Sequence, residues 1–141
     1  LVFAPREPMG PTYLARHRHA DLFLDTLPYN ACGTAYKALL AGLPVLTCAG
    51  ETFAGRTAGA MLLAAGLPEL VTHSIDEYER LANRLVREAD LLSGIRLRLA
   101  QARSGSALFD GERAVRELET AFARMWENWL KGEAPKPFSV P

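Results

Sequence analysis

One stretch of the chain combines residue types that can hold a phosphate group. Residues 26–34 read Thr-Leu-Pro-Tyr-Asn-Ala-Cys-Gly-Thr and lead directly into a helical pattern. A helix N-terminus has unpaired backbone N–H groups and a positive dipole, so an anion at Gly33 and Thr34 would receive those groups and the Thr34 hydroxyl. Lys37, one turn further on, would either add positive charge or face solvent. In the alternative interpretation, Thr34 or Asn30 simply caps the helix.

A second stretch fits nucleotide binding as well. Residues 4–12 hold three prolines and a glycine, which makes this loop stiff and suits either a preformed binding loop or a structural connector. The helical pattern at 12–18 carries Tyr13 and Arg16 three residues apart, on one face. A Tyr ring can stack on a base and an Arg fork can reach a ribose or a diphosphate. The alternative is a half-buried Tyr beside a solvated Arg.

Other chemistry finds little support in the sequence. His17 and His19 point to different sides of a helix and lack a third ligand, so we expect no metal site. Cys32 has no base beside it in sequence, which disfavours a catalytic thiol. The chain contains no P-loop and no Gly-x-Gly-x-x-Gly motif. It also has no Asp-x-Asp pair, so a bound diphosphate would be held by a helix dipole and cationic side chains, without a cofactor.

The composition is that of a globular protein. The 141 residues are 49% hydrophobic and carry 16 Lys+Arg against 16 Asp+Glu, which suffices for one domain and argues against binding to nucleic acid or a membrane surface. No apolar run approaches the roughly 20 residues that span a bilayer. Two cysteines are too few for a disulfide scaffold and indicate a reducing compartment, the cytoplasm. The apolar start at 1–4, without Met or a leader, predicts a strand in a fragment of a larger protein.

Short apolar runs alternate with helical patterns in the first half. Gly42 and Gly66 follow two of these patterns, where a left-handed C-terminal cap favours glycine. This alternation predicts βαβ units, that is, an α/β fold with a Rossmann-like parallel sheet and helices on both faces. The expected strands are 1–4, 21–25, 44–48 and 70–72, and the expected helices are 12–18, 34–40 and 53–65.

The second half predicts C-terminal helices. Ser74 and Glu77 form a capping box ahead of one helix, Asp90 caps a second that ends near 103, and Asp110 caps a third that ends before Gly132. We expect the apolar stripe of the third helix to pack against this lobe and a partner lobe outside this chain; the alternative is a stripe used only in the core. It comprises Val115, Leu118, Phe122, Met125, Trp126 and Trp129. Residues 1–132 would form the lobe and 133–141 an extended, proline-containing tail.

The order of short motifs carries a resemblance. The motifs are Phe3-Ala-Pro, Tyr13-x-x-Arg16, Ala20-Asp-Leu-Phe-Leu-Asp-Thr26, Asn30, Ala41-Gly-Leu-Pro-Val-Leu-Thr47, Gly50-Glu-Thr-Phe-Ala-Gly-Arg56, Ser106-Ala-Leu-Phe109 and Met125-Trp126. Together they resemble the C-terminal half of the catalytic region of the O-linked N-acetylglucosaminyltransferase family, including bacterial relatives with tetratricopeptide repeats. The likeness covers nearly the whole chain.

This resemblance implies one of two Rossmann-like lobes of a metal-independent, inverting enzyme that transfers a sugar, N-acetylglucosamine, from UDP to protein Ser or Thr. The lobe would hold the UDP-sugar, while catalytic residues, the N-terminal lobe and tetratricopeptide repeats would lie upstream. The backbone at Glu7 and Pro8 would face the uracil. Tyr13 would replace a stacking His, and Arg16 and Thr34 match family residues near the nucleotide and its diphosphate.

The chain also departs from the family pattern. Cys32-Gly33-Thr34 stands where the family has His-Thr-Thr, so one side-chain contact is lost, whereas all the backbone N–H donors remain. Lys37 replaces an Asp that accepts from the ribose, although an ammonium group cannot accept. Met9 stands near a family Lys. Two alternatives therefore stay open: a degenerate, non-catalytic interaction lobe, and a lobe of another nucleotide-sugar enzyme.

Overall fold

The computed structural model describes residues 2–8 and 10–140. Its centre is a parallel sheet of three strands in the order β1-β2-β3, with bounds Phe23–Leu24, Val45–Cys48 and Val71–Thr72. Phe23 pairs with Val45, and Thr47 pairs with Val71. All four residues of β2 are buried because this strand lies between the other two. The predicted parallel α/β architecture is confirmed.

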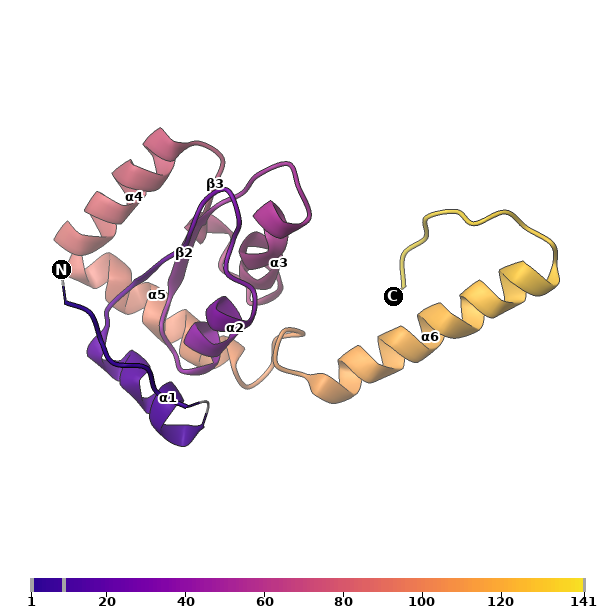
Figure 1. Cartoon of the computed structure of the whole chain (residues 1–141), viewed down its shortest axis with the longest axis horizontal. Coiled ribbons are helices and arrows are strands. Elements are labelled where there is room, and N and C mark those ends of the chain that lie inside the picture. Colours follow the sequence, from indigo (N-terminus) through magenta and orange to yellow (C-terminus); the bar gives the residue numbers. More distant parts are fainter. Residues whose placement is uncertain (1, 9, 141) are drawn as a thin grey trace.

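Helices cover both faces of the sheet. On one face lie α2 (Gly33–Leu40) and α3 (Thr57–Ala64), and on the other α4 (Ile75–Arg87); α5 (Ala89–Ala102) follows α4 and packs against it (Figure 1). The short helix α1 (Pro11–Ala15) continues into a 3-10 turn before β1. Apolar side chains from the sheet and from the helices on both faces form the core, including Leu39, Val45, Leu46, Leu62, Leu85, Ile95 and Leu99, each at most 1% exposed.

Several predicted helix ends are confirmed. Gly42 and Gly66 have φ values of 84° and 74°, the left-handed conformation that glycine adopts without strain. The Ser74 hydroxyl accepts a hydrogen bond from the Glu77 N–H at 3.2 Å, as a capping box requires. The prediction that Asp90 caps the next helix is wrong: Glu88 is the N-cap, and it is also the single residue between α4 and α5.

The N-terminal strand prediction is also wrong. Among the described residues, 2–4 form no strand, and the side chains of Val2 and Phe3 are 97% and 90% exposed. A strand needs a neighbouring backbone for its N–H and C=O groups. The described part of the chain pairs β1 with β2 and supplies no partner for this segment. Leu1, the first residue of the predicted strand, lies outside the described residues.

Helix α6 (Gly111–Leu130) extends away from the sheet and its covering helices (Figure 1). It contains no buried residue, and every member of its apolar stripe is more than half exposed. The indole rings of Trp126 and Trp129 stack on each other, with centroids 4.9 Å apart. The predictions that this stripe packs against the lobe or serves only in a core are therefore wrong. The chain turns at 103–110, after Ala102, and this turn directs α6 outward.

The segment after α6 runs back along it (Figure 1). The Arg124 guanidinium lies 4.7 Å from the centre of the Phe138 ring and donates a hydrogen bond to the Ser139 carbonyl at 3.2 Å. Residues 133–140 form no helix or strand. They cover only part of the helix, so its apolar stripe stays open to solvent.

We expect this open stripe to make the protein self-associate, because a contiguous exposed apolar patch favours association. In sedimentation equilibrium, the average mass should rise above the monomer mass of 15.4 kDa as concentration increases. Trp126→Glu should shift the protein back to monomer. Thr120→Glu, which places the same charge on an exposed polar position of α6, should not. A wild-type protein that stays monomeric at the highest soluble concentration would contradict this prediction.

Candidate functional site

The carboxyl ends of the three parallel strands meet at one edge of the sheet. The loop 25–32 leaves β1 there and leads into α2, and the loop 49–56 leaves β2 and leads into α3. In open parallel sheets, ligands bind at this edge, beside the N-termini of the following helices. These two loops therefore form the candidate site, whereas Tyr13 and Arg16 belong to the segment that precedes β1.

Asp25 organises the first loop. The residue is 5% exposed, and its Oδ1 accepts hydrogen bonds from the N–H groups of Thr26 and Ala31, each at 2.8 Å. Oδ2 accepts from the Thr47 hydroxyl at 2.6 Å. One buried side chain thus ties both ends of the loop to the central strand.

Asn30 fixes the same loop against the second one. Its Nδ2 donates to the carbonyls of Thr26 and Cys48 at 3.1 and 3.4 Å, and its backbone N–H donates to the Ala54 carbonyl at 3.2 Å. Asn30 Oδ1, the atom that a capping side chain would use, accepts no hydrogen bond, and α2 has no side-chain capping bond, so the alternative in which Asn30 or Thr34 caps α2 is wrong. The N-cap of α2 is Cys32, which makes no side-chain capping bond.

The N-terminus of α2 is consequently open. Cys32, Gly33 and Thr34 are all exposed, and the first backbone N–H groups of the helix have no capping side chain. A Cβ added to Gly33 would meet no heavy atom within 4 Å. The helix therefore presents N–H donors and a positive dipole end to solvent, which is the arrangement that an anionic ligand requires.

The structure brings α1 beside α2. The Lys37 ammonium lies 5.5 Å from the centre of the Tyr13 ring, within the range of a cation–π contact. The same ring and the His17 ring form a T-shaped pair, with ring centroids 5.4 Å apart. Lys37 thus covers one face of the Tyr13 ring, so a stacked base would need the other face or displacement of the ammonium group.

Arg16 begins the 3-10 turn after α1 and contacts the proline-containing loop that precedes α1. Its Nη1 donates to the Pro5 carbonyl at 3.4 Å, which holds the proline-containing loop against the 3-10 turn. Arg16 and Tyr13 also line a cleft of about 720 Å³ that extends to β1. Glu7 and Pro8 are exposed in this loop. Met9 lies outside the described residues.

Tyr78 lies on α4 and links this helix to the candidate site. Its hydroxyl donates to the Asp25 carbonyl at 3.0 Å. Burial, together with the nearby Asp25 carboxylate and Cys48 thiol, raises the pKa of the Tyr78 hydroxyl above its ordinary value. The phenol therefore stays protonated and keeps donating this bond well above neutral pH.

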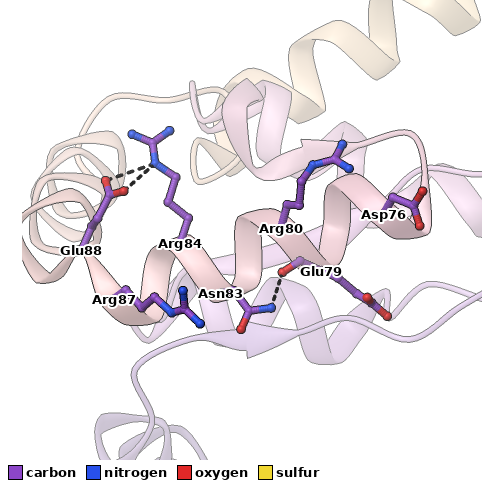
Figure 2. A pocket seen from close by; sticks show the side chains of 7 residues that line it. All are labelled: Asp76, Glu79, Arg80, Asn83, Arg84, Arg87 and Glu88. Carbon is purple, nitrogen blue, oxygen red and sulfur yellow. Dashed lines mark hydrogen bonds and ion pairs between the residues drawn. The ribbon is translucent and has the colours of Figure 1, made fainter.

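A second hollow, of about 600 Å³, lies along α4 (Figure 2). Three arginines and three acidic residues line it together with Asn83, and Arg84 is paired with Glu88 at 3.0 Å. Its lining has balanced charge, and the side chains come from α4 and its C-cap. None of the predicted nucleotide-binding residues lines this hollow, so we place the candidate site at the strand ends.

The described residues show no group of three or more His, Cys, Asp or Glu side chains close enough to hold a metal ion. The His17 ring instead directs Nδ1 at the carbonyls of Tyr13 and Leu14, at 3.1 and 3.2 Å. In the same part of the chain, no helix is both long and apolar enough to cross a membrane.

The sequence profile of glycosyl transferase family 41 matches residues 2–118. The chain belongs to this family. Among relatives of glycosyl transferase family 41, a probable UDP-N-acetylglucosamine–peptide N-acetylglucosaminyltransferase SPINDLY of Eustoma exaltatum is 34% identical over 131 residues, which cover 89% of this chain and 14% of that protein. The UDP-N-acetylglucosamine–peptide N-acetylglucosaminyltransferase of Caenorhabditis elegans is 35% identical over 85% of this chain and 10% of its own length.

A solved member of the group has the same fold. A mutant O-GlcNAc transferase of Thermobaculum terrenum superposes with a TM-score of 0.77 and 35% identity, over 89% of this chain and 23% of the solved chain. The resemblance that the motifs carry is therefore confirmed, and so is the Rossmann-like fold. The chain spans a small part of the length of each of these glycosyl transferase family 41 relatives.

The sequence interpretation missed Asp25 as an organiser of this family 41 site. The residue stands inside a motif of the family resemblance, but a single acidic residue at the end of an apolar run is typical of any strand end. The available signal was the pair of Asp25 and Thr47 at the ends of two neighbouring apolar runs, a carboxylate opposite a hydroxyl.

Proposed function

We propose that this chain is the donor-binding lobe of a UDP-sugar-dependent glycosyltransferase. The open N-terminus of α2 carries the proposal, because it offers a diphosphate backbone N–H donors and a positive dipole end, and Lys37 adds a cation later in the same helix, in contact with Tyr13. The names of the relatives support UDP-N-acetylglucosamine as the donor and a peptide as the acceptor.

In the proposed complex, the N–H groups of Gly33 and Thr34 and the Thr34 hydroxyl bind the diphosphate. Arg16 and Lys37 supply positive charge near it. The uracil lies against the backbone of Glu7 and Pro8 and the ring of Tyr13, and Cys32 lines the edge of the site. These roles are predictions from the sequence, and the contact of Tyr13 on α1 with Lys37 on α2 supports them.

The proposed reaction is a transfer with inversion and without a metal. A Ser or Thr hydroxyl of an acceptor protein attacks the anomeric carbon of the donor, the bond from that carbon to the diphosphate oxygen breaks, and UDP leaves. The negative charge that develops on the diphosphate is stabilised by the α2 N–H groups. The base that takes the hydroxyl proton belongs to an N-terminal lobe of the parent protein. The parent protein also carries tetratricopeptide repeats and acts in the cytoplasm.

Titration with UDP, followed by amide NMR shifts, tests this proposal. We expect weak binding, with shifts confined to 7–16 and 32–37, and no sugar transfer by this chain alone. Thr34→Ala and Arg16→Ala should each weaken UDP binding about fivefold, the loss of one hydrogen bond of about 1 kcal/mol. Thr120→Ala and Arg116→Ala, the same changes on the exposed face of α6, should have no effect.

Gly33→Thr gives a test in the opposite direction. The open space at Gly33 accepts a side chain, so this substitution should add a hydroxyl beside the diphosphate and strengthen UDP binding. The absence of any shift at millimolar UDP, in the wild type and in Gly33→Thr, would instead favour the degenerate interaction lobe. Tighter binding of GDP or dTDP than of UDP would favour another nucleotide-sugar enzyme.

A further inference from the structure

We propose that Asp25 is a positioning residue, which through Thr47 and the loop 26–32 holds the N-terminus of α2 in the orientation that binds a diphosphate. This inference rests on the proposed function. Asp25 itself touches no ligand. It acts through two hydrogen bonds that close the loop 26–32 and through a third hydrogen bond, from Thr47, that anchors its carboxylate.

The closing bonds lie at the two ends of the loop. Oδ1 of Asp25 accepts from the N–H of Thr26, where the loop begins, and from the N–H of Ala31, two residues before α2 starts. A single oxygen atom at 2.8 Å from both nitrogen atoms therefore sets the point at which the backbone enters the helix.

The anchor comes from the central strand. The Thr47 hydroxyl donates to Oδ2 of Asp25 at 2.6 Å, and the Asp25 N–H donates to the Leu46 carbonyl at 3.0 Å. Asp25 is 5% exposed and Thr47 is fully buried, so solvent cannot take the place of either partner. The central, buried strand β2 thus fixes the orientation of the carboxylate.

Because the Asp25 carboxylate is negative, its role is not to attract the anionic diphosphate directly. A carboxylate beneath an anion-binding helix end repels the anion, and the repulsion acts most strongly through a buried, low-dielectric region. Three hydrogen bonds that hold the loop explain its presence, because preorganised N–H donors need no rearrangement when the anion binds. The role is therefore one of geometry.

Two threonine substitutions provide a matched test. Thr47→Val removes the hydroxyl that anchors Asp25. Thr72→Val makes the same change on the neighbouring strand, where the buried Thr72 hydroxyl donates to the Thr47 carbonyl at 2.9 Å and does not contact the Asp25 side chain. The binding of UDP and of uridine is measured by NMR titration for each variant of the whole chain. The ratio of the two affinities isolates the contribution of the phosphates, which general destabilisation does not change.

We expect Thr47→Val to lower the ratio of UDP to uridine affinity about fivefold, and Thr72→Val to leave it unchanged. Asp25→Asn, which keeps an oxygen acceptor for both loop N–H groups and removes the charge, should keep or raise the ratio. The proposal is overturned if Thr47→Val and Thr72→Val change the ratio of UDP to uridine affinity equally. It is also overturned if this ratio in Asp25→Asn falls several-fold below that of the wild type.

Amide hydrogen exchange without ligand gives an independent reading of the same geometry. Thr47→Val should accelerate exchange at Ala31 more than Thr72→Val does, because only the first variant loosens the Asp25 carboxylate. Equal exchange in both variants would overturn the positioning role. If wild-type protein binds UDP no more tightly than uridine, the proposed function fails, and exchange at Ala31 still decides whether Thr47 and Asp25 hold the loop.

Discussion

Asp25→Ala is expected to lower the free energy of unfolding by about 3–5 kcal/mol, as loss of one partner from a buried polar network does. The substitution removes the acceptor of three hydrogen bonds and leaves two backbone N–H groups and the Thr47 hydroxyl without their partner. Urea denaturation followed by circular dichroism measures the change, as a lower midpoint with a similar slope.

Asp21→Ala is the matched control, because Asp21 lies four residues earlier in the same motif. Its side chain is 81% exposed and pairs with Arg96 at 3.0 Å. An exposed ion pair contributes at most about 1 kcal/mol, so this variant should unfold close to the wild type. Equal destabilisation by both substitutions would show that the Asp25 network contributes no more than a surface contact.

Gly55→Ala is expected to destabilise the protein by about 1–3 kcal/mol, the usual cost of adding a methyl group where there is no room. A Cβ at Gly55 would lie 3.1 Å from the Pro28 carbonyl oxygen and 3.3 Å from the Gly50 Cα. Both are backbone atoms, so the two loops of the candidate site must move apart. Thermal unfolding should detect the loss, and the amide shifts should change in both loops.

Gly94→Ala is the comparison, with the opposite sign. Gly94 lies inside α5, and a Cβ there would meet no heavy atom within 4 Å. Alanine is favoured over glycine inside a helix by about 1 kcal/mol, so this variant should unfold at a higher temperature. A Gly55→Ala protein as stable as Gly94→Ala would show that the loops separate without cost.

The elements that sequence reasoning predicted well have local causes. Ser74 with Glu77, Asp110, and the glycines at 42 and 66 act on the backbone within a few residues, so their effects can be read along the chain. The parallel sheet followed from the alternation of short apolar runs with helical patterns. The family followed from the order of its motifs, which 35% identity to a solved member confirms.

The failures have non-local causes. Residues 2–4 have a strand-like composition, but the described chain gives them no neighbouring backbone. The apolar stripe of α6 has the spacing of a buried face, but spacing does not say what covers it. Asn30 has the residue type of a helix cap, but α2 begins only at Gly33, and the side chain of Asn30 instead donates to the carbonyls of Thr26 and Cys48.

The candidate site also contains residues that the local sequence predicts and a contact that it does not predict. Sequence identified Gly33 and Thr34 from helix-end chemistry alone, and those residues lie at an open helix end. It could not foresee that Lys37 would lie over the Tyr13 ring, because that contact depends on how α1 packs beside α2. Their roles toward UDP stay predictions that the titrations address.

The exposure of α6 has a consequence for how the chain unfolds. Since α6 contributes no buried residue, its own backbone hydrogen bonds and the few contacts from the segment after it are what hold it helical. Most of the stability of a helix in a protein comes from packing of its apolar face, and the apolar face of α6 is exposed. The sheet with α2 to α5 therefore forms one cooperative unit, and α6 melts as a separate, weaker one.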